Sequence, residues 1–521
     1  MSGEEIQGQA PERGRGRSRR PARGGVSGLA QKPFRQPRGP AVPTSLLSAD
    51  QIEAIHDASL TILEEIGMDF LHEGAKAILA TAGARVDPGS DRVRFDRGMI
   101  TEAITTCPSE YTLHARNPAH NIRFGGGWTA FGMIASAPNC TDTDRGRRPG
   151  NQQDFRDLVK LAQSFNIIHL TGGYPVEPVD IHASVRHLDC LSDFVKLTDK
   201  AFHCYSLGRE RNLDAIEIAR IGRGISAEQM EREPSLFSII NSSSPLRLDT
   251  PMLQGIIEMS SRNQIIVMTP FTLAGAMAPV TLAGALAQQN AEALAGIAFT
   301  QIVRPGAPVA YGGFTSNVDM KSGAPAFGTP EYMKAAMIGG QLARRYGLPY
   351  RTSNVCAANT VDAQAAYESV FSLWGAIMGG GNFIMHSAGW LEGGLSASFE
   401  KTILDVDLLQ MVAEFLEPVI VDDDTLALDA VREVGPGKHY FGAAHTQARY
   451  RDAFYAPILS DWRNFETWEE AGSPTAMQKA NKVWKDVLAA YEQPPLDPAI
   501  EEELDAFVTK RKAEGGFKTD F

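Results

Sequence analysis

The sequence predicts an α/β protein, a (β/α)8 TIM barrel with an N-terminal cap and a C-terminal helical extension. Apolar or β-branched runs alternate with helical patterns eight times between residues 129 and 418, and this count over about 290 residues is typical of the barrel. Polar and aromatic residues follow each run, at the strand ends where barrels carry their chemistry. An open doubly wound sheet is less favoured, because Ala137-Pro138-Asn139 stands where such sheets usually carry a glycine-rich phosphate turn.

The eight predicted strands are runs of apolar, β-branched and aromatic residues bounded by turn-forming residues. They span residues 129–136, 167–171, 202–207, 237–241, 265–269, 308–313, 349–354 and 383–387. The predicted helices follow at residues 152–165, 184–197, 211–223, 250–261, 283–303, 330–346, 363–378 and 399–416. Asn151, Thr329 and Asp362 stand where N-cap side chains would begin three of these helices.

Two further regions flank the predicted barrel domain at 129–418. Residues 44–128 mix short helical and strand patterns and are predicted to form the N-terminal cap, whose first helix begins at a capping box of Ser48 and Gln51. Residues 419–521 begin as a polar segment and end in two helices, near 475–491 and 498–512. An apolar face on the first of these helices predicts that the extension wraps the outside of the barrel.

The charge of the chain is divided unevenly along its length. Residues 1–43 hold nine Lys or Arg and three Glu, a net charge of +6 within a total of −12, so the rest carries −18. Because this leader also has almost no large apolar residue, it is predicted to be a disordered basic tail. A basic tail can contact nucleic acid or anionic lipid. The acidic body nevertheless argues against nucleic acid as a partner.

Composition also predicts the cellular compartment of the protein. No apolar run is long and uncharged enough to span a bilayer, and no apolar segment follows the basic N-terminus as a secretory signal requires. The cysteines are scattered without a CxxC pair, which favours a reducing environment. They are Cys107, Cys140, Cys190, Cys204 and Cys356. We therefore expect a cytoplasmic protein with no membrane partner.

The most informative stretch is NFIMHSAGWLEGG, residues 382–394. It begins as a strand and then places His386, Trp390 and Glu392 in a loop that contains three glycines, Gly389, Gly393 and Gly394. His386 and Glu392 are the candidate catalytic residues, because the loop after a barrel strand is where such groups gather. The alternatives are a structural histidine that ends a strand, and a glutamate that pairs with an arginine.

Aromatic residues are the second feature of the predicted strand ends, and familiar catalytic sets are missing. There is no HExxH, no GxSxG, no P-loop, and no strand-end lysine suited to a Schiff base, so the sequence predicts no metal site. Ring faces hold a quaternary ammonium ion, each contributing about 0.5–2 kcal/mol when desolvated. The alternative is simple packing. The candidate substrate-binding aromatics are Phe131, Tyr174, Tyr205, Phe271, Tyr311 and Phe314.

From Leu47 to the C-terminus the sequence resembles the trimethylamine methyltransferase family of corrinoid-dependent methyltransferases. The resemblance is carried by LSADQIEAIHDASLTILEEIG, SAPNCTDTDRGRRPG, VDAQAAYESVFSLWGAIMGGGNFIMHSAGWLEGGLSASFEK and VGPGKHYFGAAHT, which begin at residues 47, 136, 361 and 434. It implies a (β/α)8 barrel that moves a methyl group from a methylated amine to the cobalt of a separate corrinoid protein. No tightly bound cofactor is expected on this chain.

One departure from that family implies the substrate class. Members that act on trimethylamine carry pyrrolysine, whereas this chain has only standard residues. Members without pyrrolysine act on quaternary amines such as glycine betaine, whose charged nitrogen leaves as a neutral amine when Co(I) attacks the methyl group. Arg351 is then the candidate that grips a donor carboxylate, since a guanidinium binds carboxylates in a bidentate way. The competing interpretation is an ion pair at the barrel rim.

The resemblance also implies how the corrinoid reaches this protein. The chain has no DxHxxG motif, so the corrinoid is expected to arrive on a partner protein and enter at the barrel mouth. Gly389, Gly393 and Gly394 leave room for a flat macrocycle beside His386 and Trp390. We expect this loop to contact it.

Several alternatives remain open from sequence. The chain could demethylate another donor such as a sulfonium, catalyse a metal-free lyase reaction if a base–acid pair exists, or bind a substrate with a decayed site. The sequence identifies neither the donor nor the corrinoid protein. We expect a homo-oligomer.

Overall fold

A computed structural model of the chain describes residue 29 and residues 31–517, and it shows an α/β fold around a curled parallel sheet. Six strands pair in the order β11-β13-β15-β18-β19-β6, and two more, β9 and β10, pair with each other. Single parallel bridges, Gly132 with Leu170 and His203 with Phe237, connect the pair to the two edges of the six-stranded sheet. The strands are β6 (Ala130–Phe131), β9 (Leu170–Thr171), β10 (Ala201–Phe202), β11 (Phe237–Ile240), β13 (Ile265–Met268), β15 (Val309–Gly312), β18 (Tyr350–Ser353) and β19 (Phe383–Met385).

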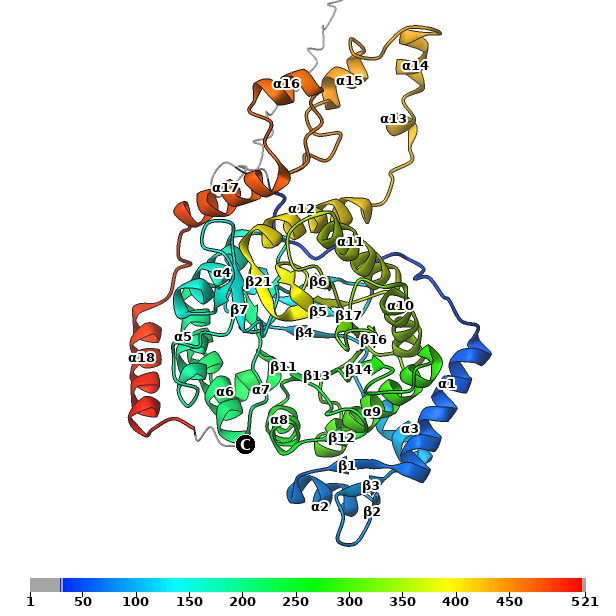
Figure 1. The fold of residues 1–521 in the computed structure, drawn as a ribbon, viewed down its shortest axis with the longest axis vertical. Coiled ribbons are helices and arrows are strands. Elements are labelled where there is room, and N and C mark those ends of the chain that lie inside the picture. The colour runs from blue at the N-terminus through cyan, green and yellow to red at the C-terminus, as the bar shows by residue number, and fades with distance from the viewer. Residues whose placement is uncertain (1–28, 30, 518–521) are drawn as a thin grey trace, which may run out of the picture.

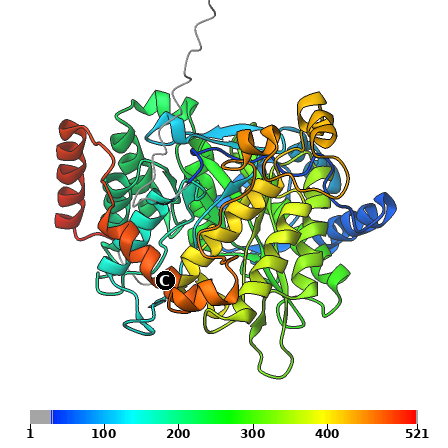
Figure 2. The same ribbon diagram turned by 90° about the horizontal axis from the view of Figure 1, so that it is seen from above.

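Helices surround these strands on the outside (Figure 1; Figure 2 shows the same arrangement from above). They are α4 (Gln152–Ser164), α5 (Arg186–Leu197), α6 (Arg209–Arg223), α8 (Thr250–Ser261), α9 (Leu282–Val303), α10 (Pro330–Arg345), α11 (Ala363–Met378) and α12 (Phe399–Phe415), with the short α7 (Ala227–Arg232) after α6. The side chains of Asn151, Thr329 and Asp362 accept backbone N–H groups at the starts of α4, α10 and α11. These are the N-caps that the sequence predicts.

All of the eight strands except β9 end earlier than predicted, where the chain leaves the sheet. The first predicted strand extends to Ser136, but paired structure in β6 stops at Phe131. Ser136 has a φ of 66°, a left-handed conformation that no regular strand contains. His386, immediately after β19, is similar, with a φ of 55°. These irregular segments turn side chains toward the mouth of the fold.

Two small sheets, which the sequence does not predict, extend the mouth beyond the strand ends. One has the order β14-β16-β17, from β14 (Phe271–Ala274), β16 (Phe314–Val318) and β17 (Pro325–Ala326). The other has the order β20-β21-β7-β8, from β20 (Trp390–Leu391), β21 (Ser396–Ser398), β7 (Asn139–Thr141) and β8 (Arg148–Pro149). A 3-10 turn, η4 (Glu392–Gly394), joins β20 to β21. The second sheet therefore includes β20, near the end of the 382–394 loop, and connects it through β21 to β7 and β8.

The opposite end of the fold is closed by a hairpin of the N-terminal cap, β4 (Tyr111–Leu113) and β5 (Ile122–Phe124). Phe124 is fully buried, and its ring lies 5.5 Å from that of Phe383 in β19. The hairpin shares an apolar cluster with inward residues of the strands, including Val267 and Ala310. Apolar packing thus fills the interior below the mouth.

The remainder of the cap lies against α8 and α9 (Figure 1). It contains α1 (Ala49–Thr61), η2 (Ile62–Ile66), α2 (Glu73–Thr81), α3 (Arg97–Thr105) and the strands β1 (Met68–Phe70), β2 (Arg85–Val86) and β3 (Arg92–Arg94), whose sheet β12 (Arg247–Leu248) joins from the barrel region. The turn η3 (Pro118–His120) lies instead between β4 and β5, where His120 contacts Asp199. Ser48 and Gln51 form the predicted capping box. Residues 31–43, predicted as part of a disordered tail, lie along the body, with Lys32 paired to Glu414. Apart from Leu29, the rest of that tail is outside the described residues.

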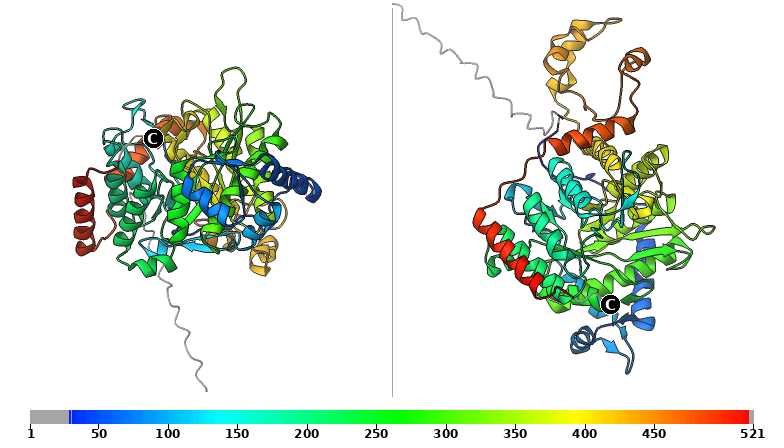
Figure 3. Two further views of the ribbon diagram at one scale, coloured as in Figure 1. Left: turned by 90° about the horizontal axis from the view of Figure 1, so that it is seen from below. Right: turned by 60° about the vertical axis from the view of Figure 1, so that its left-hand side comes forward.

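The C-terminal extension contains α13 (Asp423–Leu426), α14 (Leu428–Val434), α15 (Ala444–Arg449), α16 (Phe465–Glu470), α17 (Ala476–Ala489) and α18 (Pro498–Ala513). The two last helices pack on the body, α17 through Trp484, whose ring lies 4.7 Å from that of Phe399. The segment before them projects away from it, as Figure 3 shows. Within the described residues no helix is long and apolar enough to cross a bilayer.

The closing hairpin should contribute strongly to stability. We expect Phe124→Ala to lower the free energy of unfolding by about 3–5 kcal/mol, because it leaves a cavity in a packed interior. Urea denaturation of the purified variant measures this. Val280→Ala is the control, since Val280 is 71% exposed and its loss should change stability by no more than about 0.5 kcal/mol. A Phe124→Ala change no larger than the control's would contradict the assigned role of the hairpin.

Candidate functional site

A cavity of about 430 Å³ opens at the C-terminal ends of the parallel strands. This volume is within the range of small-molecule sites. Its wall combines strand ends with the two small sheets of the mouth. The lining residues are Ala135, Ser136, Pro138, Gly172, His203, Tyr205, Ser206, Ile239, Asn241, Met252, Phe271, Phe314, Pro325, Phe327, Arg351, Met385, His386, Trp390, Gly393, Gly394 and Leu395. Among them there is no aspartate or glutamate.

Much of the predicted site is gathered in this one cavity. The aromatics Tyr205, Phe271 and Phe314 line it, as does Arg351. From the predicted corrinoid-facing loop, the lining residues are His386, Trp390, Gly393 and Gly394.

Four aromatic rings form a continuous wall on one side of the cavity. Phe271 and Phe314 are aligned partners in the parallel pair β14–β16, and their ring centroids lie 5.2 Å apart. Phe327 lies 5.6 Å from Phe314 and 6.0 Å from Trp390. The indole N–H of Trp390 donates to the carbonyl of Cys356 at 3.0 Å, which fixes the ring. Such a wall can hold a cation by its ring faces.

Arg351 supplies a positive charge beside this wall. Its guanidinium lies 5.3 Å from the Phe314 centroid, and the residue is only 3% exposed. Burial lowers the pKa of Arg351 to about 10, so the group stays charged at neutral pH. No described residue pairs with its Nε or Nη1 atoms. A buried, unpaired charge is costly, so its presence at a cavity points to an anionic ligand group.

Two histidines add hydrogen-bond donors next to Arg351. The backbone N–H of Ala135 donates to Nδ1 of His386 at 3.3 Å, so the neutral ring carries its proton on Nε2. That Nε2 lies 3.4 Å from Nη2 of Arg351. Both atoms then carry hydrogens, so neither group can accept a hydrogen bond from the other. Each of them still lacks an acceptor. His203 is similar, since Nε2 accepts from Ile239 N–H at 3.0 Å and Nδ1 finds no partner among the described residues.

The same surroundings keep both histidines uncharged. Burial, with the nearby Arg351 charge, lowers the pKa of His386 well below its usual value. Burial also lowers the pKa of His203 to about 3. A neutral His386 donates one hydrogen bond and serves poorly as an acid at neutral pH.

Glu392 and Gly389, two further predicted residues of the loop, have structural roles. Glu392 accepts from Arg147 Nε at 2.9 and 3.1 Å and is not a lining residue of the cavity. Gly389 has a φ of 98°, donates its N–H to Asp405 at 2.9 Å, and would place a Cβ 2.7 Å from Thr402. Both residues therefore hold the loop in shape.

Three predicted aromatics are outside the cavity. Tyr311 points to α9, where its hydroxyl donates to Asn290 at 3.0 Å. Phe131 is buried against the His169 ring, 5.6 Å away. Tyr174 lines a neighbouring cavity of about 190 Å³, and its ring lies 4.7 Å from that of Tyr205, which separates the two spaces.

Sequence reasoning missed two residues of the site. His203 is the second residue of the predicted strand 202–207, whereas in the structure it directly follows β10, at the C-terminal end of that strand. Phe327 comes from the segment between β17 and α10, where no periodicity marks it.

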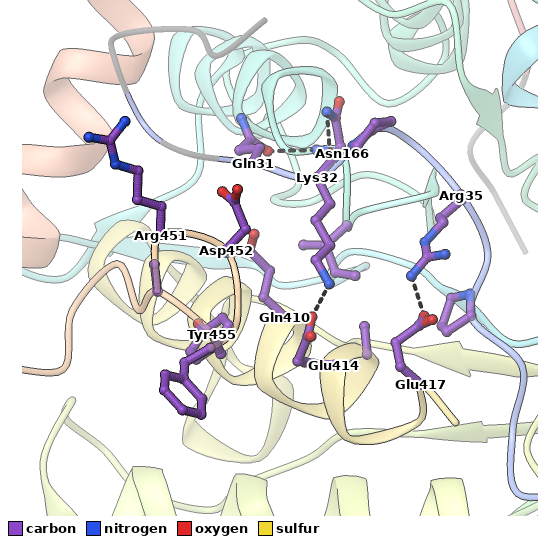
Figure 4. Close-up of a pocket in the computed structure, with 16 residues that line it drawn as sticks. Gln31, Lys32, Arg35, Asn166, Gln410, Glu414, Glu417, Arg451, Asp452 and Tyr455 are labelled. Carbon is purple, nitrogen blue, oxygen red and sulfur yellow. Dashed lines mark hydrogen bonds and ion pairs between the residues drawn. The ribbon is translucent and has the colours of Figure 1, made fainter. Parts of the chain in front are cut away.

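A third cavity, of about 280 Å³, lies near the N-terminal ends of the strands (Figure 4). Its charged residues include two basic side chains that are already paired, Lys32 with Glu414 and Arg35 with Glu417. Barrel folds carry their chemistry at the opposite end. The cavity at the mouth, with its unpaired arginine, is the stronger candidate site.

The fold and this cavity define an α/β protein with a cavity of ligand size at its strand ends. The chain belongs to the trimethylamine methyltransferase (MTTB) family, whose sequence model matches residues 13–516. Glycine betaine methyltransferase of Desulfitobacterium hafniense is 38% identical over 473 residues, which cover 91% of this chain and 98% of that protein. Trimethylamine methyltransferase MttB2 of Methanosarcina mazei is 29% identical, covering 92% of this chain and 97% of that protein.

Among solved structures, the monomethylamine methyltransferase MtmB of Methanosarcina barkeri aligns with a TM-score of 0.43 and 9% identity. The alignment covers 85% of this chain and 98% of that protein. This likeness is too distant to place individual residues.

The neutral state of His386 predicts a pH dependence of stability. An unfolded histidine titrates near pH 6.5. Below that pH the unfolded chain binds a proton that folded His386 does not, so stability falls as pH falls. Between pH 7.5 and 5.5 we expect the wild type to lose about 1 kcal/mol more unfolding free energy than His386→Asn. Urea denaturation at both pH values measures the difference, and identical losses would show that His386 titrates normally in the folded protein.

Proposed function

We propose that this protein transfers a methyl group from a quaternary amine that bears a carboxylate, of the glycine betaine type, to the cobalt of a corrinoid on a separate protein. The single observation that carries the proposal is the buried guanidinium of Arg351, whose Nε and Nη1 have no partner among the described residues, beside a wall of four aromatic rings. A zwitterion matches both features, since its ammonium meets ring faces and its carboxylate meets donors. The 38% identity to glycine betaine methyltransferase supports the same substrate class.

The charge balance of the cavity favours a zwitterion over a simple cation. The described lining residues offer a guanidinium and no carboxylate, so a ligand with only a positive charge would meet repulsion. A ligand that brings its own carboxylate neutralises Arg351. In this proposal His386 Nε2–H and His203 Nδ1–H donate to that carboxylate or to the polar groups next to it. The rings of Phe271, Phe327 and Trp390 remain for the trimethylammonium group.

The protein's own contribution is binding and alignment. The transferred methyl carbon bonds to the acceptor as its bond to nitrogen breaks, and the electron pair of that bond stays on nitrogen as the neutral amine leaves. The corrinoid supplies the nucleophile for this exchange. No side chain has to move a proton during the exchange, which agrees with a neutral His386.

The rim of the cavity fits a large, flat partner surface. Gly393 and Gly394 have φ values of 62° and 100°, and a Cβ on Gly394 would lie 2.6 Å from the Trp390 ring. Any side chain at Gly394 would therefore displace the indole. We infer that η4 and Trp390 form the rim that the corrinoid protein approaches, and that Glu392 holds this rim through Arg147 rather than acting in catalysis.

We also infer that the eight parallel strands close into one (β/α)8 barrel. The bridges at Gly132–Leu170 and His203–Phe237 support closure, because they connect the strand pair β9–β10 to both edges of the larger sheet. Closure would place the cavity over the barrel axis, at the end that the β4–β5 hairpin leaves open.

A direct assay tests the function. Purified protein is mixed with a reduced corrinoid protein and a panel of methylated compounds, and methylation of cobalt is followed by its absorption spectrum. We expect transfer from glycine betaine or a close carboxylated relative. Trimethylamine and a sulfonium are the comparison donors. Transfer only from a sulfonium would replace the proposed substrate class, and binding of betaines without transfer under any condition would favour a binding protein.

Arg351 gives a sharper prediction. Arg351→Lys should weaken binding of a carboxylated donor roughly 10- to 100-fold, since it loses charge-assisted hydrogen bonds of about 1.5–3 kcal/mol. Tetramethylammonium, which has no carboxylate, should bind no more weakly than to the wild type. Titration calorimetry with both ligands measures this, and Arg344→Lys, which changes an arginine outside the cavity, is the matched control. Equal losses for both ligands would contradict the carboxylate role.

A further inference from the structure

Residues 419–470, which we call the arm, expose most of their large apolar side chains. Val419, Phe441 and Phe454 are 88%, 78% and 86% exposed. The others are Ile420, Val421, Leu426, Leu428, Val431, Tyr440, Tyr450, Trp462 and Phe465. Single exposed apolar residues are ordinary on a protein surface, whereas a concentration of this size marks an interaction site.

The arm is anchored at its base and free beyond it. Asp407 of α12 accepts the backbone N–H groups of Ile458 and Leu459 at 2.9 and 3.1 Å. Between residues 419 and 450, the side-chain hydrogen bonds and ion pairs of the described chain join two residues of the arm, as in Arg449 with Asp424. Figures 1 and 3 show the arm extending beyond α11 and α12 instead of lying on them.

A second exposed apolar surface lies on the neighbouring helices, and we call it the side face. On α11, Tyr367, Val370, Phe371 and Trp374 recur at positions i, i+3, i+4 and i+7, which places them on one stripe. They are 36–61% exposed, while the other side of α11, with Ala365 and Leu373, is buried. Met411 and Phe415 of α12 continue the stripe, and the Trp374 and Phe415 rings lie 5.0 Å apart.

The two surfaces together are larger than a soluble monomer usually leaves uncovered. A large aromatic side chain presents about 150–250 Å² when fully exposed, so the arm and the side face expose on the order of 2,000 Å² of apolar side chain. The largest apolar patch on a typical monomer is about 300–600 Å². A stable interface needs about 800 Å² from each partner, and obligate homodimers use more.

We propose that the arm and the side face form an interface between two copies of this chain, in which the arm of each copy covers the side face of the other. An area of this size suits a permanent partner, and a second copy of the chain is always present with it. A two-fold axis satisfies both surfaces at once, because each copy supplies one arm and one side face.

The position of the interface is compatible with the proposed activity. The side face lies on the outer wall formed by α11 and α12, and the arm projects outward beyond these helices (Figure 1), whereas the cavity opens at the strand ends. A second copy at the wall leaves the mouth open to a small donor and to a corrinoid protein.

The mass of the full-length protein in solution tests the proposal. Light scattering after size exclusion at about 10 μM should give at least twice the chain mass of 56.5 kDa. The arm variant, Phe441→Asp with Phe454→Asp, and the side-face variant, Phe371→Asp with Phe415→Asp, should each shift the protein toward the monomer. We expect the dissociation constant to rise at least 100-fold. Val280→Asp, at an exposed apolar site outside both surfaces, should leave the mass unchanged.

A mixing experiment tests whether the arm of one copy binds the side face of another. The arm variant keeps an intact side face and the side-face variant keeps an intact arm, so an equimolar mixture should regain dimers through one arm–face contact. Circular dichroism confirms that both variants remain folded. A monomeric wild type, variants that keep the wild-type mass, or a mixture that stays monomeric would each overturn the proposal.

Discussion

The site depends on one uncompensated charge. Arg351 is carried on a central strand of the parallel sheet, and its guanidinium reaches a cavity that contains no carboxylate. Such a charge can be tolerated only if the surrounding structure holds it firmly and a ligand later neutralises it. Burial keeps the two histidines beside it neutral, and the charge of Arg351 adds to this effect because a second cation would be repelled. In the proposed function, the rings opposite receive the other end of the ligand.

The architecture explains how these groups converge. Parallel strands bring their C-terminal ends to one place, so residues far apart in sequence, such as His203, Arg351 and His386, line one space. The small sheets of the mouth add Phe271 and Phe314 in register. The β4–β5 hairpin packs the interior from the other end, which gives the strands a firm base.

Periodicity was sufficient to predict most of the framework. Helix positions agree with the structure to within a few residues, because caps such as Asn151 and Asp362 and the spacing of apolar residues are local signals. The direction of individual strand side chains was harder to predict. A parallel strand buried on both faces loses the alternation that separates inward from outward positions. Tyr311 therefore looked like a cavity residue, although its hydroxyl donates to a helix on the outside.

The missed parts of the site share a physical reason. Phe327 reaches the cavity from a segment without regular structure, and its position depends on long-range packing that no local pattern encodes. The burial of Arg351, and the lack of a partner for its Nε and Nη1 within the described part of the chain, are likewise properties of the assembled fold. The sequence was sufficient to select Arg351 as a candidate, whereas its environment is known only from the structure.

The most direct test of the account compares two ligands that share the trimethylammonium group and differ at the carboxyl end, which is charged in one and neutral in the other. Titration calorimetry of the wild-type protein with glycine betaine and with its methyl ester keeps the trimethylammonium group constant. The account predicts that the ester, which leaves Arg351 unneutralised, binds at least roughly ten-fold more weakly, a loss of about 1.4 kcal/mol or more. Equal affinities, or tighter binding of the ester, would contradict the central role of Arg351.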